Sequence, residues 1–534
     1  MQGNKIKKYL AFTGGAMFAA AAVALPIIAI NNSTKNAASF DFDKIGVYVE
    51  KSWTPAYEMA IKKYNETYPD KKYDIQLLEL GSFEVIGLIE TLGYADQKIP
   101  DLIYAPIDRV PSLVESSGAL VGFDSPEKLI SSEFDPKIYD GLGVENFARK
   151  GEALIIPPNT PQPAIPQPYY FGVPHSTEAL ILYYKGFSQE EIKTIENIAN
   201  IVNKNNWKEE MYGFKFNDLW FGLGVIAGFL EAEQEGAGQN GQLVGKVLVS
   251  NNTFETKFQS NMTNVEKNNS DYPLENYENT PGWSESGITI APERATKALQ
   301  SALDFLASFY NSSKVHNELT NTDGNDWLIL DADGFNARAI NLATDRKVKK
   351  AAMIDGPWKV TDFSNIFTDA VPIPPIKNGV PYLQAPGGWL YAINQRNATN
   401  PDKIRDMKRF LNILLSDEDV IRAQYQNAGK IIEGSFAKGV LQNYANNPTT
   451  PKLVAETINA VFASKTMDQR PDGGNADFAQ VWSRWDENGF RYPPTKDFLV
   501  NFSTKLTDAE VAQKLKSALA VSFTTMIRAL QGKG

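Results

Sequence analysis

Short apolar runs separated by longer mixed segments dominate the N-terminal third of the chain. The runs are Lys44–Val49, Asp74–Leu80 and Asp101–Tyr104. Each has the length of a buried strand, and the segments between them, Thr54–Tyr68 and Ser82–Leu92, have the length of helices. Thr54 followed by Pro55 predicts the N-cap and the first residue of the first helix. Strands that alternate with helices favour an α/β fold with a largely parallel sheet.

The same strand pattern returns later, at Leu180–Tyr184, Lys350–Ile354 and Trp389–Ile393. Open sheets of this kind bind ligands at the carboxyl ends of their strands, so we expect functional side chains there. The proline-rich stretch Pro157–Pro168 and the polar stretch Asn251–Gly282 predict loops or insertions, because neither has the pattern of a helix or a strand.

Composition limits the chemistry that the chain can perform. At 534 residues it is too long for one compact core, which predicts two or more domains. Its net charge of −10 argues against binding to a nucleic-acid backbone, because such binding needs basic patches. The sequence has no cysteine, and its histidines are His175 and His316. Thiolate metal sites, disulfides and cysteine nucleophiles are therefore excluded, and we expect no metal and no cofactor.

A hydrophobic segment near the N-terminus predicts export. Lys5, Lys7 and Lys8 precede an uncharged run from Tyr9 to Ile30, which a polar stretch follows. The run is long enough to span a bilayer as a helix. We therefore favour an uncleaved membrane anchor over a cleaved signal peptide, with the rest of the chain at the outer face of the cell membrane.

Six segments carry a family resemblance when they are taken in order. They are Asp101–Arg109 (DLIYAPIDR), Tyr170–Tyr184 (YFGVPHSTEALILYY), Phe216–Gly228 (FNDLWFGLGVIAG), Ala352–Trp358 (AMIDGPW), Gly387–Asn394 (GGWLYAIN) and Leu411–Asp419 (LNILLSDED). Together they resemble maltose/maltodextrin-binding proteins, which are family 1 extracellular solute-binding proteins of ABC importers. The chain departs from that family at Ala105, where an aromatic residue is usual, and at the charged run Arg346–Lys350.

The resemblance implies a two-lobed, periplasmic-binding-protein-like (type II) α/β fold, with discontinuous lobes joined by a hinge and an N-terminal anchor helix. Residues 1–38 would form the signal or anchor segment and a linker. Residues 39–176 with about 380–425 would form the N-terminal lobe, and about 177–379 with 426–534 the C-terminal lobe.

The resemblance also implies which residues contact a sugar. Sugar rings offer apolar faces and a rim of hydroxyls, so a receptor needs flat aromatic rings together with charged or amide groups. The aromatic candidates are Trp358, Trp220 with Phe221, and Trp482, with Trp53, Trp389 and Trp485 less favoured; the polar candidates are Asp108, Arg109, Glu178, Glu50 and Lys51. A tryptophan can instead be part of the core, and an exposed pair such as Asp108 with Arg109 can be purely structural.

The implied function is capture of maltodextrin-like oligosaccharides by hinge closure and delivery to the transmembrane subunits of an ABC permease. The sequence has no GxxxxGK[ST] phosphate loop, so ATP hydrolysis would belong to the partner and the chain would not be an enzyme. Three alternatives stay open. They are the same fold with another solute such as a polyamine, glycerol phosphate or anion, an exported glycoside hydrolase, and an anchored adhesin.

Overall fold

The computed structural model describes residues 38–115, 117–155, 167–204, 209–214, 219–233, 348–384 and 387–464, with the single positions 298, 301, 302, 304 and 305. The expected anchor Tyr9–Ile30, most of Pro157–Pro168, the insertion Asn251–Gly282 and the candidate Trp482 lie outside these residues. Within them, no helix has both the length and the apolar character needed to cross a membrane.

The chain divides into two compact units, and each is made of two stretches of sequence. Unit 1 consists of Met1–Glu178 and Gly387–Tyr444, and unit 2 of Ala179–Pro386 and Ala445–Gly534. The stretch 426–444 therefore lies in unit 1, whereas the sequence analysis assigned it to the C-terminal lobe. Its place follows from strand β12 (Ile431–Ile432), which pairs with strand β6 (Gly172–Glu178) of unit 1.

A six-stranded sheet forms the centre of unit 1, in the order β12-β6-β11-β3-β1-β2. Its remaining strands are β1 (Ile45–Val49), β2 (Ile75–Glu79), β3 (Leu102–Pro106) and β11 (Gly387–Ile393). β1 pairs in parallel with β2 and β3, while β11 runs antiparallel to β3 and β6. The sheet is therefore mixed rather than largely parallel, because the returning strand β11 enters between β3 and β6. A hairpin of β4 (Glu152–Ile155) and β5 (Gln167–Tyr170) belongs to the same unit.

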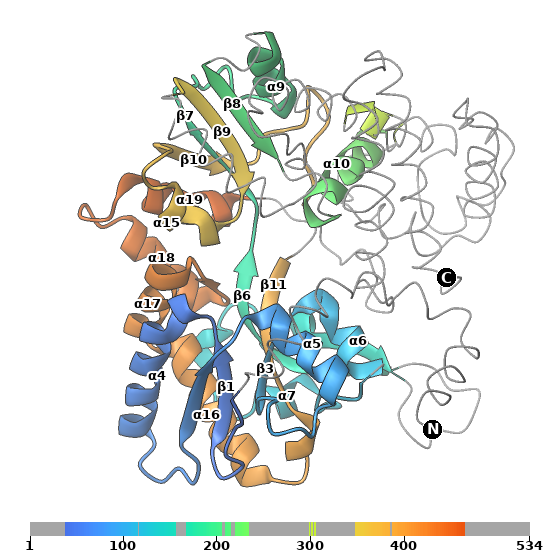
Figure 1. Ribbon diagram of the computed structural model, residues 1–534, viewed down its shortest axis with the longest axis vertical. Helices are drawn as coiled ribbons and strands as arrows, with labels where there is room; N and C mark the ends of the chain where they lie inside the picture. Colours follow the sequence, from blue (N-terminus) through green and yellow to red (C-terminus); the bar gives the residue numbers. More distant parts are fainter. Residues whose placement is uncertain are drawn as a thin grey trace, which may run out of the picture. The chain divides into compact units, whose positions relative to one another are not determined.

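Helices cover both faces of this sheet, as Figure 1 shows. One face carries α4 (Thr54–Thr67), α16 (Pro401–Ser416) and α17 (Glu418–Ala428). The other carries α5 (Ser82–Leu92) and α6 (Val110–Glu115). Unit 1 further contains the short helices α7 (Pro126–Leu129) and α8 (Val144–Ala148), and α18 (Ser435–Ala445) at its C-terminal boundary. The unit is thus a three-layer α/β structure.

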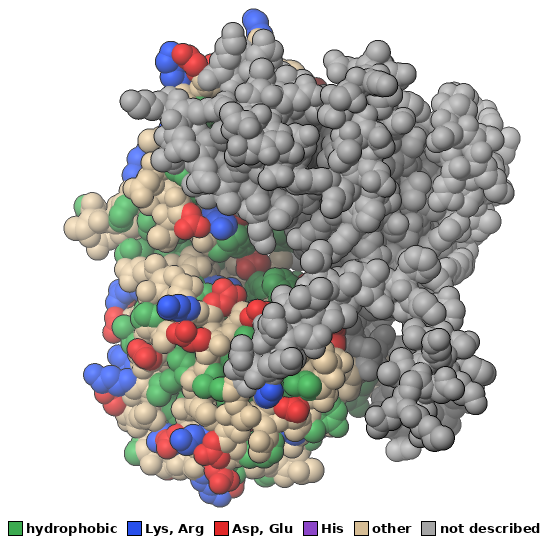
Figure 2. All heavy atoms as spheres, viewed as in Figure 1, with side chains coloured by type: hydrophobic (Ala, Val, Ile, Leu, Met, Phe, Trp, Pro, Cys, Tyr) green, Lys and Arg blue, Asp and Glu red, His purple; other side chains and the backbone are tan. Residues whose placement is uncertain are grey.

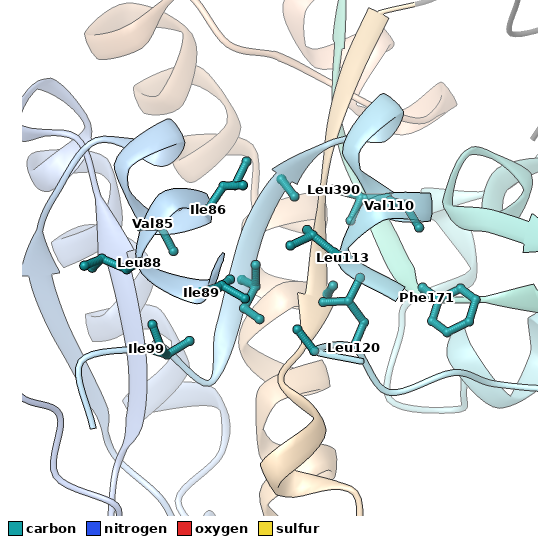
Figure 3. Close-up of a cluster of buried hydrophobic side chains, with 14 of the residues drawn as sticks. Val85, Ile86, Leu88, Ile89, Ile99, Val110, Leu113, Leu120, Phe171 and Leu390 are labelled. Carbon is teal, nitrogen blue, oxygen red and sulfur yellow. The ribbon is translucent and has the colours of Figure 1, made fainter. Parts of the chain in front are cut away.

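Alternate residues of the central strands point to opposite faces of the sheet, as the pleat requires. Ile103, Ala105, Leu390 and Ala392 are buried in one apolar cluster with side chains of α5 and α6. The α5 and α6 members in Figure 3 are Val85, Ile86, Leu88, Ile89, Val110 and Leu113. This packing fixes α5 and α6 on one face, and with them the loops that enter both helices.

The buried carboxylate of Asp101 joins the two stretches of unit 1. It accepts a hydrogen bond from the backbone N–H of Gly46 at 2.8 Å. From the later stretch it pairs with Arg396 at 2.9 Å and with Lys403 at 3.0 Å, and Asn397 donates to it at 2.9 Å. Because the carboxylate is fully buried, these partners replace the water that a charge otherwise needs.

The start of α4 differs from the prediction. Helical structure begins at Thr54 itself, with Trp53 in the N-cap position and no side-chain cap. The Thr54 hydroxyl donates to Glu79 Oε1 at 3.1 Å, on the neighbouring strand β2, and is therefore not used as a cap.

Unit 2 contains a four-stranded sheet in the order β10-β7-β9-β8. Its strands are β7 (Ile181–Lys185), β8 (Glu210–Phe214), β9 (Lys350–Asp355) and β10 (Asp369–Pro372). Its described helices are α9 (Ile195–Lys204), α10 (Leu219–Ala232), α15 (Val360–Phe363) and α19 (Lys452–Ala463). β8 and β9 are parallel, and β7 is antiparallel to β9 and β10. α19, from the second stretch, is held to β10 where Glu456 accepts the backbone N–H of Ala370 at 2.8 Å.

The surface of unit 1 mixes charges of both signs. On the face that Figure 2 shows, acidic and basic side chains are interspersed over the described part. Opposite charges pair locally, as Lys128 and Asp124 do at 2.7 Å. Such exposed pairs add little to stability because water screens them.

Candidate functional site

One edge of the unit 1 sheet gathers most of the predicted polar residues. β11 is antiparallel to both β3 and β6, so β6 runs in the same direction as β3 and β1, and their carboxyl ends share an edge. Glu50 follows β1, Asp108 and Arg109 lie in a short 3-10 helix after β3, and Glu178 ends β6. The edge is the place where sheets of this kind bind ligands.

Cross-strand register adds a tryptophan to this edge. Gly387, the first residue of β11, lies opposite Glu178, and Trp389 lies two residues further along the same strand. Residues two apart on a strand share a face, so Trp389 and Glu178 are diagonal neighbours. The Trp389 side chain makes a hydrogen bond to the Glu178 carboxylate that lowers its pKa. On its other side β11 pairs with β3, where Trp389 lies opposite Pro106 and stacks on Tyr104 two residues away, with ring centroids 5.0 Å apart and planes at 11°.

A lysine that the sequence analysis did not single out lies at the centre of this edge. Lys430 immediately precedes β12, whose first residue pairs with Thr177, next to Glu178. Its Nζ lies 4.3 Å from the ring centroid of Trp53, 5.1 Å from Tyr104 and 5.2 Å from Trp389. It is also 4.0 Å from Glu178 Oε1. The side chains of Lys430 and Glu178 are only 11% and 17% exposed.

Burial and charge act in opposite directions on this pair. Burial raises the pKa of Glu178, and the negative charges of Asp108 and Glu50 add to the rise. The Lys430 ammonium opposes it by favouring the carboxylate. Burial likewise lowers the pKa of Lys430, while Glu178 and Glu50 favour its charged form. Each charge therefore compensates the desolvation of the other.

Glu50 and a neighbouring aromatic residue extend the site along the same edge. Ser82, the first residue of α5, donates its hydroxyl to Glu50 Oε1 at 3.3 Å. Phe83 follows it and is 63% exposed, an unusual position for a phenylalanine. Its ring meets the edge of Trp389, with centroids 5.2 Å apart and planes at 72°. Phe83 is thus an exposed aromatic surface beside Trp389.

The other predicted residues of unit 1 lie close by. Asp108 and Arg109 are partly buried, and the effect of Asp108 on the pKa of Glu178 places its charge near that carboxylate. Lys51 is exposed and begins the 3-10 helix Lys51–Trp53 that carries Trp53 to Lys430.

His175 lies beneath these residues as a buried, neutral group. Its Nδ1 is 3.2 Å from the Tyr104 hydroxyl, and its Nε2 is 2.7 Å from Gln424 Oε1. Burial, together with the positive charge of Lys430, lowers its pKa to about 3. The imidazole therefore positions Tyr104 and does not titrate near neutral pH.

Unit 2 places two of the predicted tryptophans together. Trp358 follows the carboxyl end of β9, and Trp220 lies in the first turn of α10, which follows β8 in the sequence. Their ring centroids are 6.0 Å apart with planes at 35°, and both side chains are partly exposed. A Cβ at Gly356 would come within 2.1 Å of the Trp358 ring, so glycine at this position makes room for the tryptophan.

Phe221 occupies a different environment from Trp220. It is 3% exposed and packs in the core of unit 2 near Phe214. Its backbone carbonyl accepts a hydrogen bond from the Tyr382 hydroxyl at 2.8 Å.

Sequence reasoning identified the acidic residues of this edge but not Lys430 or Phe83. Neither belongs to a motif, since Lys430 stands between a helix and a two-residue strand and Phe83 reads as an ordinary apolar helix residue. Among the described residues, no group of three or more His, Cys, Asp or Glu side chains could hold a metal ion. The arrangement offers aromatic faces and carboxylates, which suit a polar organic ligand.

Comparison with known proteins identifies the fold. No family model and no curated protein matches the chain. The chain is similar in structure to MalX from Streptococcus pneumoniae, which was solved in complex with maltopentaose. The likeness has a TM-score of 0.53 and 17% identity, and covers 91% of this chain and 99% of that one. MalE from Listeria monocytogenes, solved with maltose, matches at 14% identity and a TM-score of 0.49, over 90% of this chain and 98% of that one. The likeness to MalX confirms the predicted two-lobed α/β fold.

Proposed function

We propose that the chain is the extracellular substrate-binding component of an ABC carbohydrate importer and captures maltodextrin-like oligosaccharides. The observation that carries this proposal is the meeting of aromatic rings and carboxylates at the strand edge of unit 1, where Phe83 is 63% exposed and Trp389 is buried behind it. Trp389 packs there against Phe83 and makes a hydrogen bond to Glu178. Within unit 2, the rings of Trp220 and Trp358 are adjacent to each other. The shared fold of MalX, described with maltopentaose, supports the same class of ligand.

A pyranose presents flat C–H faces, which stack on aromatic rings, and hydroxyls, which donate to carboxylates. Glu178, Asp108 and Glu50 supply acceptors in the proposal, and Arg109 and Lys51 supply donors for ring and hydroxyl oxygens. Hinge closure would follow from contacts that the second unit adds once sugar is bound.

The proposal includes a partner and a location. The sugar-loaded chain would dock on the transmembrane subunits of a permease at the outer face of the cell membrane. The charged N-terminus followed by the uncharged run Tyr9–Ile30 supports export, and a membrane anchor belongs to the proposal on that ground.

A ligand panel tests the proposal. We expect the melting temperature of the purified chain to rise with maltose through maltoheptaose, in a graded way with chain length, because a ligand of the folded state stabilises it. Other disaccharides, polyamines, glycerol phosphates and simple anions complete the panel. A rise only with polyamines or anions would overturn the ligand and keep the fold, and no shift at all would favour an adhesin.

The same sample separates binding from hydrolysis. A binding protein leaves the maltodextrins intact, so no reducing ends should appear during long incubation. Release of reducing ends that disappears in Glu178→Gln would instead assign a glycoside hydrolase, since glycosidic cleavage needs a carboxylic acid at that place.

A further inference from the structure

The ammonium group of Lys430 lies among three aromatic rings. All three ring centroids, of Trp53, Tyr104 and Trp389, are within 5.2 Å of its Nζ. The Trp53 ring stands at 82° to Tyr104, while Trp389 is stacked on Tyr104, so the rings border the ammonium from two directions. A cation at such distances is attracted by the electron-rich faces of the rings.

Carboxylates complete this environment. Glu178 Oε1 is 4.0 Å from the Lys430 Nζ, and the charge of Glu50 also favours the protonated lysine. Several aromatic rings with carboxylates nearby form the arrangement by which proteins bind organic ammonium ions. Here the chain's own side chain supplies the ammonium.

We propose that Lys430 is a specificity-determining residue that fills an ammonium site of unit 1 from within and thereby restricts this edge to uncharged, hydroxylated ligands. The inference rests on the proposed function, because it takes the strand edge to be the ligand site. It adds the reason why carboxylates beside aromatic rings select a neutral sugar here and not a polyamine.

The selection follows from charge and space. The Lys430 ammonium already occupies the place where an incoming ammonium ion would contact the three rings and the Glu178 carboxylate. The two like charges would repel strongly there, because the place is poorly hydrated. A neutral sugar meets no such repulsion. Glu178 is held by Lys430 and Trp389, and its remaining carboxylate lone pairs can accept hydrogen bonds from sugar hydroxyls. Removal of the lysine charge should therefore open the site to an external ammonium ion.

The test compares binding of tetramethylammonium chloride and of maltotriose to the full chain by calorimetry, at constant ionic strength. The variants are Lys430→Ala, the double variant Lys430→Ala/Glu178→Gln, and Lys137→Ala as the matched control. Lys137 also lies over a ring, Phe436, at 4.3 Å, and pairs with Asp135 at 3.2 Å, but its side chain is 40% exposed and neither partner is among the rings and carboxylates around Lys430. We expect the wild type and K137A not to bind tetramethylammonium. K430A should bind it with a Kd at least about tenfold below the concentration up to which the wild type shows no binding, the scale of one or two gained cation–π contacts.

Tetramethylammonium binding by K430A and by the wild type decides whether Lys430 fills an ammonium site. A gain in K430A that the added E178Q abolishes supports the inference, whereas a folded K430A without a gain overturns it. Tetramethylammonium binding by the wild type overturns it as well, and this measurement needs no variant. If K430A does not fold, Lys430→Met replaces it, because the flexible thioether keeps the apolar stem and can move aside; no gain there has the same meaning. Maltotriose binding is scored separately, so failure of the sugar proposal shows as its absence in the wild type, whatever the cation does.

Discussion

At the scale of single residues, burial decides which chemical group is available. Glu178 and Lys430 are almost covered, and the charge of each favours the charged form of the other against the effect of burial. His175 is buried, has Tyr104 and Gln424 as its hydrogen-bonding partners and is held neutral. Trp358 is partly exposed beside Trp220 and so offers a ring face. The site thus depends as much on the surroundings of each residue as on its type.

Trp358→Ala should weaken maltodextrin binding by about 1–3 kcal/mol, on the scale of losing an aromatic contact to a ligand. Calorimetry with maltotriose measures the change. Trp358→Phe is the matched control, because it keeps a ring and should retain most of the affinity. An unchanged affinity in a properly folded W358A would remove Trp358 from the site.

The pH dependence of stability should report the neutral state of His175. Its pKa is about 3 in the folded chain against 6.5 ordinarily, so between these values the unfolded state binds the extra proton. The contribution of His175 to the free energy of unfolding is complete above pH 6.5. It falls by about 1.4 kcal/mol for each pH unit between 6.5 and about 3. Denaturation of the wild type and of His175→Gln across this range measures it. A constant difference between the two would contradict the neutral assignment.

At the scale of elements, the ends of strands and helices decide which residues come together at the candidate site. β1, β3 and β6 end at one edge, and β11 and β12 begin there, so residues distant in the chain become neighbours. Helix α5 begins at the same edge, because its apolar face packs on β3 and fixes its entry loop (Figure 3). The first turn of α5 is therefore functional in our proposal, and its last turn is not.

Phe83→Ala and Leu92→Ala test separately whether the first and the last turn of α5 take part in ligand binding. Both side chains are exposed, at 63% and 38%, so neither change should cost much stability. We expect F83A to weaken maltodextrin binding by about 1 kcal/mol, because a ring contact is lost, and L92A to leave it unchanged. Equal affinities in both variants would exclude Phe83 from ligand contact.

At the scale of the whole molecule, each unit is assembled from two stretches of sequence. In unit 1 the buried Asp101 binds Gly46 from the first stretch and Arg396 and Lys403 from the second. The contact is made far from the strand ends that carry the site, at the opposite end of β3. Its role is therefore in stability and not in ligand binding.

Asp101→Asn should lower the free energy of unfolding by about 3–5 kcal/mol, since it leaves two buried cations without their counter-charge. Asp124→Asn is the control, because its exposed pair with Lys128 should contribute less than about 1 kcal/mol. Urea denaturation of both variants gives the comparison. A D101N variant as stable as D124N would show that the buried network contributes little.

The sequence by itself determined many of the elements and predicted part of the candidate site. Alternation of apolar runs with helical segments predicted β1, β2, β3 and the helices between them within a few residues, because local pattern decides local structure. It also indicated that the residues after β1 and β3, and Glu178, would be functional. Only the tertiary structure showed that β11 enters antiparallel and brings Trp389 to Glu178, and that β12 brings Lys430 between three rings. Strand pairing between distant stretches sets these contacts, and the order of residues along the chain does not encode which strands will be neighbours.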